Sequence, residues 1–401
     1  MNTKKIAYLL AFVLFFGVAF YAKAADDERY LVKSTSGVWK KYFGVRHSFD
    51  NGFTADLSGF QIRFAKIFGL EIEPVNKLYV LPEENLSSAA KPENPGKGNK
   101  GSGGGERILP ADQMPWGVEM IYNDPLLIES SGGDGVNVAV LDTGVLTTHL
   151  DLVNRIKGCK DFTQRKSPIV DNKCEDKNGH GTHVSGIIAA DSGSDGLGIY
   201  GVAPAVNLHA YQVCSANGSC WADDIAMGIR TAADNKANII NLSLGSDSQS
   251  SLITDAIAYA VNNGVLVVAA AGNDGPYVGS VDYPAASNKV IAVGALDVNK
   301  VISDWSSRGI NSQTTAYLVE DGDIEFAAPG VSVESTWKDG GYAILSGTSM
   351  AAPHISGLAA KLWQKDALAP ADATRDLLRK FSTDLLPLGD DDDSGWGIPT
   401  L

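Results

Sequence analysis

The chain has 401 residues, of which 44% are hydrophobic and 20% are charged. Such a composition is ordinary for a globular protein, gives enough chain for one large core and a smaller domain, and argues against disorder throughout. The formal net charge of −14 would repel a phosphate backbone, so no nucleic-acid partner is indicated.

The amino-terminal end has the pattern of a secretion signal. Lys4 and Lys5 precede an apolar run over residues 6–21, and Ala22-Lys23-Ala24 then gives the small-x-small pattern that a signal peptidase accepts. The run is shorter than the roughly 20 residues that span a bilayer, which disfavours an uncleaved anchor. We therefore predict a signal peptide over residues 1–24 and a secreted, extracellular protein that is monomeric and has no membrane contact.

Beyond the signal, the composition divides the chain into three parts. Residues 25–90 have the pattern of short strands with a helix between them. Residues 91–107 are rich in Pro, Gly, Lys, Asn and Ser and nearly free of apolar side chains, so they are predicted to be a flexible linker. Residues 108–401 then form the large domain.

The large domain alternates apolar runs with helix-length segments. The runs have the length of buried parallel strands and cover residues 136–141, 206–213, 239–244, 265–270 and 290–293. Candidate helices cover residues 183–191, 222–235, 252–263, 349–364 and 371–381. This alternation predicts an α/β fold with a doubly wound, mostly parallel sheet flanked by helices.

The four cysteines all lie in this large domain. An even number of cysteines in an exported protein favours two disulfide bridges. Proximity in the sequence makes Cys159–Cys174 and Cys214–Cys220 the simplest pairing. The alternative, free buried thiols, is common in reducing compartments and less expected after export.

Three reactive side chains lie within two residues of a glycine at the ends of predicted buried elements: Asp142, His180 and Ser349. A serine hydroxyl needs a base within hydrogen-bonding reach before it can attack a carbonyl, and a histidine can be that base. A carboxylate on the other imidazole nitrogen fixes the tautomer and stabilises the cation that forms. Because ligands gather at the carboxyl ends of parallel strands, we expect the three side chains to converge there as nucleophile, base and orienting acid.

The negative charge that develops on the attacked carbonyl oxygen needs donors placed in advance. Asn273 follows a predicted strand and offers an amide side chain, while Ser349 offers its backbone N–H at a helix N-terminus. A zinc protease is disfavoured because His180 and His183 lack the glutamate of the His-Glu-x-x-His pattern. An α/β-hydrolase is disfavoured because its serine comes first in the chain and lies in Gly-x-Ser-x-Gly.

From about residue 112 onward the chain resembles the subtilases, the subtilisin-like serine proteases. The resemblance rests on residues 138–144, 180–186, 241–245, 271–273 and 347–354, and on the order aspartate, histidine, serine. It implies a serine endopeptidase that hydrolyses peptide bonds in proteins and needs no organic cofactor. The alternative, a catalytically silent binding protein of the same fold, is disfavoured because the three catalytic residues and Asn273 are all present.

The resemblance extends to an inhibitory propeptide over residues 25–90, which would make the chain a zymogen that blocks its own cleft. It also implies a structural calcium ion. The implied ligands are carboxylates of Asp151 and Asp195 and main-chain carbonyls of Leu197 and Ile199, and a weaker second site is implied around Asp171, Glu175 and Asp176.

By the same resemblance, an extended substrate would lie between two edge segments and form main-chain hydrogen bonds with both. The substrate-binding residues implied are Gly218, Ser219, Ser243, Leu244, Gly245, Ala271 and Gly272. The floor of the primary pocket would carry Asp282 and its rim Asp274. Two carboxylates there predict cleavage after Arg or Lys, with Lys100 and Arg107 as accessible points of self-cleavage. An Asp282 that points to solvent would instead leave an apolar pocket.

Overall fold

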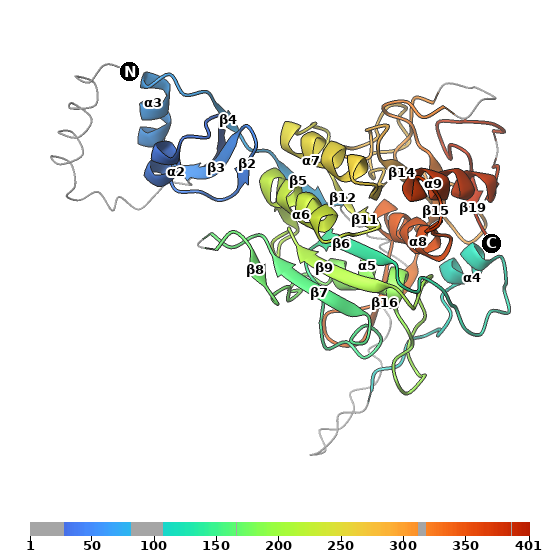
Figure 1. Cartoon of the computed structure of the whole chain (residues 1–401). Coiled ribbons are helices and arrows are strands. Elements are labelled where there is room, and N and C mark those ends of the chain that lie inside the picture. The colour runs from blue at the N-terminus through green and yellow to red at the C-terminus, as the bar shows by residue number, and fades with distance from the viewer. Residues whose placement is uncertain (1–27, 82–106, 166, 312–317, 386) are drawn as a thin grey trace, which may run out of the picture. The chain divides into compact units, whose positions relative to one another are not determined.

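A computed structural model describes residues 28–81, 107–165, 167–311, 318–385 and 387–401. The chain divides into two compact units, one ending at Val75 and the other beginning at Asn76 (Figure 1). The predicted signal peptide and nearly all of the predicted linker lie outside the described residues.

The first unit is a small antiparallel sheet with two helices packed on it. The strand order is β2-β3-β1-β4, and Val32, Phe53 and Leu57 are among the buried side chains of its core. Ser58 starts α3 with a capping box, in which its hydroxyl and the side chain of Gln61 satisfy each other's backbone N–H. The elements are β1 Glu28–Val32, α2 Gly37–Phe43, β2 Ser48–Phe49, β3 Gly52–Leu57, α3 Gly59–Ile67 and β4 Ile72–Pro74.

The second unit is built on an eight-stranded sheet of order β15-β14-β13-β11-β6-β9-β7-β8. Its neighbours pair in parallel except β7 with β8. The central strands are buried on both faces, which is why they read as continuous apolar runs. The strands are β6 Asn137–Asp142, β7 Ile156–Asp161, β8 Val170–Asp171, β9 Asn207–Gln212, β11 Ile239–Leu242, β13 Leu266–Ala270, β14 Ile291–Leu296 and β15 Phe326–Pro329.

Helices cover both faces of this sheet. Helix α8 contacts β11, β13, β14 and β15 and packs on α5, whereas α6 and α7 pack against each other and against β6 and β13 (Figure 1). The helices are α4 Trp116–Tyr122, α5 His180–Ala189, α6 Ala222–Asp234, α7 Ser251–Asn262, α8 Thr348–Lys361 and α9 Pro370–Lys380.

Three small antiparallel sheets complete the second unit. Two are the hairpin β16–β17, Val333–Thr336 with Tyr342–Leu345, and the pair β18–β19, Ser382–Thr383 with Ile398–Pro399. The third has the order β10-β5-β12, from Ser219–Trp221, Lys77–Val80 and Leu244–Gly245.

The predicted fold class is confirmed, and the five predicted strands correspond to β6, β9, β11, β13 and β14. Strands β7, β8 and β15 were not predicted. The sequence of β7 carries two lysines and an aspartate, and β15 is only four residues long, so neither has the long apolar run that marks a buried strand.

Candidate active site

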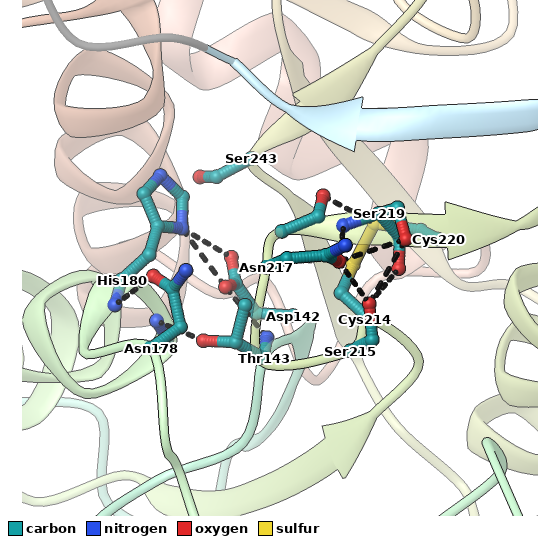
Figure 2. The surroundings of a disulfide bond; sticks show 12 residues. Asp142, Thr143, Asn178, His180, Cys214, Ser215, Asn217, Ser219, Cys220 and Ser243 are labelled. Atoms are coloured by element: carbon teal, nitrogen blue, oxygen red, sulfur yellow. Dashed lines mark hydrogen bonds and ion pairs between the residues drawn. A yellow bond between two sulfur atoms is a disulfide. The ribbon is translucent and has the colours of Figure 1, made fainter.

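Asp142 and His180 meet where strand β6 ends and helix α5 begins. The Nδ1 atom of His180 lies 2.8 Å from Oδ1 and 3.0 Å from Oδ2 of Asp142, and both side chains are buried (Figure 2). Gly179 precedes the helix with a φ of 113°, a left-handed conformation that favours glycine. The carboxylate therefore holds the proton of the imidazole on Nδ1 and directs Nε2 away from Asp142.

Ser349 is the second residue of α8, and its hydroxyl donates to the carbonyl oxygen of Ser243 at 3.2 Å. In return, the Ser243 hydroxyl donates to the carbonyl oxygen of Ser349 at 2.9 Å. The side-chain amide of Asn241 donates to the Ser243 hydroxyl at 3.0 Å and fixes its direction. These three bonds tie the candidate nucleophile to the segment that the sequence predicts to bind substrate.

The side chain of Asn273 is oriented by the residue before Ser349. Its Oδ1 accepts from the backbone N–H of Thr348 at 3.0 Å and from the Thr348 hydroxyl at 2.9 Å. Because Oδ1 is held in this way, Nδ2 faces the start of α8, where a methyl group on Gly347 would lie 3.4 Å from it. The role predicted for Asn273, donation to an oxyanion near Ser349, would require Nδ2 on this side.

The buried carboxylate of Asp176 organises the residues around His180, and sequence reasoning missed this role. Its Oδ1 accepts from the Thr143 hydroxyl at 2.9 Å and from the backbone N–H groups of Asn178 at 3.0 Å and Gly179 at 2.8 Å. Its Oδ2 accepts from the backbone N–H and the hydroxyl of Thr182 at 2.9 and 2.7 Å. The one feature of the sequence that could have indicated this role is the position of Asp176, four residues before His180 and near the start of a helix.

Two other histidines near the site are structural. Burial lowers the pKa of His183 to about 3 and that of His354 to about 4, so both are neutral near pH 7. The Nε2 atom of His183 contacts the carbonyl oxygens of Val333 and Ala343, and Nδ1 of His354 contacts that of Met350.

The edge segments expected to bind substrate flank one extended strand of the chain itself. Strand β5 pairs antiparallel with β10 on one side and with β12 on the other, and Val80 donates its N–H to the carbonyl oxygen of Gly218 at 2.9 Å. Tyr79 lies opposite both Ser219 and Gly245. An antiparallel three-stranded ladder of the expected kind is therefore formed at this cleft.

Both predicted disulfide bridges are present. Cys214–Cys220 joins the segment after β9 to the middle residue of β10 (Figure 2). Cys159–Cys174 joins β7 to the segment that precedes Asp176. The first bridge restrains the edge that the sequence predicts to bind substrate, and the second restrains the segment that leads into α5.

Asp282 is buried between the two walls of the predicted primary pocket. Methyl groups on Gly245 and Gly272 would each lie 2.9 Å from its Oδ2. Desolvation, with contributions from the carboxylates of Asp274 and Asp247, raises the pKa of Asp282 to about 7. Ala271, a further wall residue, accepts the backbone N–H of Asp282 at 2.8 Å.

The residues expected to hold calcium surround the guanidinium of Arg107. Its Nη2 bonds to Oδ1 of the buried Asp151 and its Nη1 to Oδ1 of Asp195. Oδ2 of Asp151 accepts the backbone N–H of Ile199 at 3.0 Å, and Leu197 donates its N–H to Asp195 at 3.2 Å. A cationic side chain from the edge of the predicted linker thus lies at the expected metal position.

Comparisons with known proteins agree with this geometry. The sequence pattern described as "Subtilase family" matches residues 133–397. The chain belongs to the subtilase family. It is 44% identical over 382 residues to "Subtilisin" of Bacillus sp. (strain TA39), covering 90% of this chain and 87% of that protein. It is 40% identical over 275 residues to "Subtilisin Savinase" of Lederbergia lenta, covering 69% and 93%.

Solved structures give the same result. This subtilase matches "Sphericase" with a TM-score of 0.69 and 47% identity, over 73% of this chain and 99% of that one. It matches "S41 Psychrophilic Protease" with a TM-score of 0.68 and 45% identity, over 74% and 100%. The chain is therefore a serine endopeptidase, and the alternative of a silent binding protein is not favoured.

The contacts of Asp176 generate a prediction for stability and activity. Asp176→Asn replaces one acceptor oxygen with an NH₂ group that faces hydrogen-bond donors. The free energy of unfolding should therefore fall by about 2–3 kcal/mol. Turnover should also fall because the start of α5 positions His180. Urea unfolding in a Ser349→Ala background, which prevents autolysis, measures the first effect, and peptide hydrolysis measures the second.

Asp171→Asn is the matched control, because Asp171 is an exposed carboxylate on the nearby β8 that is paired with Lys160. It should change stability by less than about 1 kcal/mol. Equal effects of the two substitutions would contradict the role assigned to Asp176.

Proposed function

We propose that this subtilase is a secreted endopeptidase in which Ser349 attacks the peptide carbonyl while His180 takes its proton. Asp142 stabilises the resulting imidazolium. Nδ2 of Asn273 and the backbone N–H of Ser349 then donate to the oxyanion. His180 returns the proton to the leaving amine, and water hydrolyses the acyl-enzyme by the reverse sequence of proton transfers.

The contact of Asp142 with Nδ1 of His180 carries this proposal, because it leaves Nε2 as the nitrogen that can act on a substrate-side proton. The signal pattern over residues 1–24 supports secretion, as do the two disulfides, which persist in oxidising compartments. None of the helices in the described part of the chain has the length and hydropathy that a bilayer crossing requires.

A fluorophosphonate probe tests the catalytic roles directly. The protein freed of residues before Arg107 should be labelled at Ser349, as identified by peptide mass spectrometry. His180→Ala should slow labelling by about a thousandfold or more, because the hydroxyl loses its base. Ser251→Ala, on the exposed first residue of α7, is the control and should label normally. Labelling that survives Ser349→Ala would reject the assignment.

The preference proposed for Arg or Lys before the cut bond rests on Asp282. Its buried carboxylate lies between Gly245 and Gly272, and its Oδ1 accepts no hydrogen bond from the described residues. A charge-assisted hydrogen bond to a substrate cation would contribute roughly 1.5–3 kcal/mol, enough for a preference of about tenfold or more. The exposed Asp274 adds a weaker attraction at the rim.

This specificity should depend on pH. Because the pKa of Asp282 is about 7, the carboxylate forms as pH rises through 7, and the ratio of kcat/KM for Arg over Leu substrates should rise with it. Ionisation of His180 affects both substrates and cancels in the ratio. Asp282→Asn should give a low ratio that is flat from pH 5 to 9, whereas a flat, high ratio in the wild type would exclude Asp282 from recognition.

We also assign the segment that ends at Leu81 as an inhibitor that is held in the cleft and is not cut. Val80 lies opposite Leu244, so Leu81 comes next, toward Ser243 and the hydroxyl of Ser349. The following residue in the sequence is Pro82, whose ring restricts the conformation on both sides of its peptide bond. Leu81 also has no charge to pair with Asp282. Maturation would then occur downstream, at Lys100. Arg107, which the sequence suggested as an accessible cut point, is only 12% exposed because its side chain is paired with Asp151 and Asp195.

Sequencing of the mature amino terminus tests this maturation route. The wild type should begin after Lys100, and early samples should contain an uncut fragment that extends past Leu81. Pro82→Ala should allow a new cut after Leu81, with Ser349→Ala as the uncut control. A wild-type terminus at residue 82 would contradict the route.

Calcium is proposed for the site around Asp151 and Asp195. The oxygen donors are of the type that calcium prefers, and a guanidinium already lies among them as a stand-in cation. Carbonyls of Leu197 and Ile199 would complete part of the shell and stabilise the loop. The second position considered at Asp176 is disfavoured, because both of its oxygens already accept several hydrogen bonds.

Arg107 and calcium should therefore exclude each other. In an uncut Ser349→Ala precursor, Arg107→Ala should strengthen calcium binding in titration calorimetry and increase the rise in melting temperature caused by calcium. Lys157→Ala, on an exposed lysine, is the control and should change neither. If neither the precursor nor its Arg107→Ala variant binds calcium, the proposed site is wrong. If both bind calcium equally, Arg107 does not compete with the ion.

A further inference from the structure

The floor and rim of the primary pocket hold a third carboxylate that the sequence did not indicate. Asp247, Asp274 and Asp282 each offer an oxygen, and these three oxygens lie within 4.8 Å of one another. They come from three separate places: the loop after β12, the residue next to Asn273, and the segment before Pro284. We call these three residues the carboxylate cluster.

Backbone hydrogen bonds fix the buried member of this cluster. Asp282 donates its N–H to the carbonyl oxygen of Ala271 at 2.8 Å, while Tyr283 and Ser246 exchange N–H to carbonyl bonds of 2.9 and 3.0 Å. The floor segment is thus bonded to both walls of the pocket. The N–H of Asp274 is held by the Ser307 hydroxyl at 3.1 Å. The rim and floor are built before any ligand arrives.

Asp282 is only 3% exposed, and its Oδ1 accepts no hydrogen bond within the described part of the chain. A buried acceptor without a donor is costly. Burial, and after it the neighbouring carboxylates, raise the pKa values of Asp282 and Asp274, so the like charges at this spacing add to the cost. A cationic group with several hydrogen-bond donors would offset both the unbonded acceptor and the repulsion between the carboxylates.

We infer that Asp247 completes a guanidinium site and makes this subtilase select Arg over Lys before the cut bond. This rests on the basic preference proposed above and refines it. A guanidinium carries five N–H donors in a planar fork, so it can bond to carboxylates on different sides at once. An ammonium is a compact, strongly hydrated charge, and burying it against Asp282 costs more.

The two exposed members and the buried member have different roles. Asp282 lies at the floor and attracts any long cation that reaches it. Asp247 and Asp274 are exposed, so each contributes less, and their effect is directional: they accept the outer N–H groups that arginine has and lysine lacks. Removing the carboxylate of Asp247 should therefore lower the ratio of kcat/KM for Arg over Lys substrates. Removing that of Asp282 should lower kcat/KM for both Arg and Lys substrates relative to Leu substrates.

The test uses mature enzyme and three peptide substrates that differ only in Arg, Lys or Leu before the cut bond, at pH 8.5 and fixed ionic strength. Asp247→Asn should lower the ratio of kcat/KM for Arg over Lys by about threefold to fivefold and leave Leu unchanged. Asp255→Asn, on an exposed position of α7, removes the same charge outside the cluster and should leave all ratios unchanged.

Three outcomes would overturn the inference. If Asp247→Asn changes Arg and Lys equally while Asp282→Asn still lowers both relative to Leu, the guanidinium site fails and the basic preference stands. If Asp282→Asn also has no effect, the basic preference itself fails. If calcium inhibits Arg hydrolysis competitively in the wild type and not in Asp247→Asn, with the Arg to Lys ratio unchanged, the cluster is a metal site.

Discussion

The hydrogen bonds of one buried carboxylate, Asp176, hold together the two segments that carry the proposed catalytic residues Asp142 and His180. They join Thr143, directly after β6, to the backbone at the start of α5. Asp142 and His180 are the last and first residues of those two elements, so their mutual geometry follows from this junction. The hydroxyl of Thr143 also accepts the N–H of Gly181 at 2.9 Å, which ties the same two segments a second time.

In the proposed function, main-chain hydrogen bonds hold the substrate, while selectivity depends on one pocket. Strand β5 shows how an extended segment fits: it bonds to both edges and needs no particular side chain for those bonds. The bridge Cys214–Cys220 restrains one edge, and the bonds between Ser243 and Ser349 restrain the other. In the binding mode that we propose, this ladder would place the next substrate side chain at the carboxylates around Asp282, where charge would discriminate between substrates.

Some residues of the candidate site could be recognised from the sequence, and others could not. Motifs around Asp142, His180, Ser349 and Asn273 were recognisable because each combines a reactive side chain with the glycine or helix start that its position requires. Asp247 was not recognisable, since a lone aspartate in a loop of Ser and Gln residues reads as a solvated turn. The same holds for Arg107, whose partners Asp151 and Asp195 are distant in sequence.

The sequence by itself determined the fold class and the two disulfide pairings, and it supplied the order of the proposed catalytic residues, because these follow from local patterns: apolar period, cysteine spacing and glycine placement. Only the tertiary structure decided which carboxylates share a pocket, which cation lies at the loop of Asp195 and which segment of the chain fills the cleft. Such groupings depend on contacts between residues far apart in the chain. Burial and charge act through those contacts, and no local pattern records them.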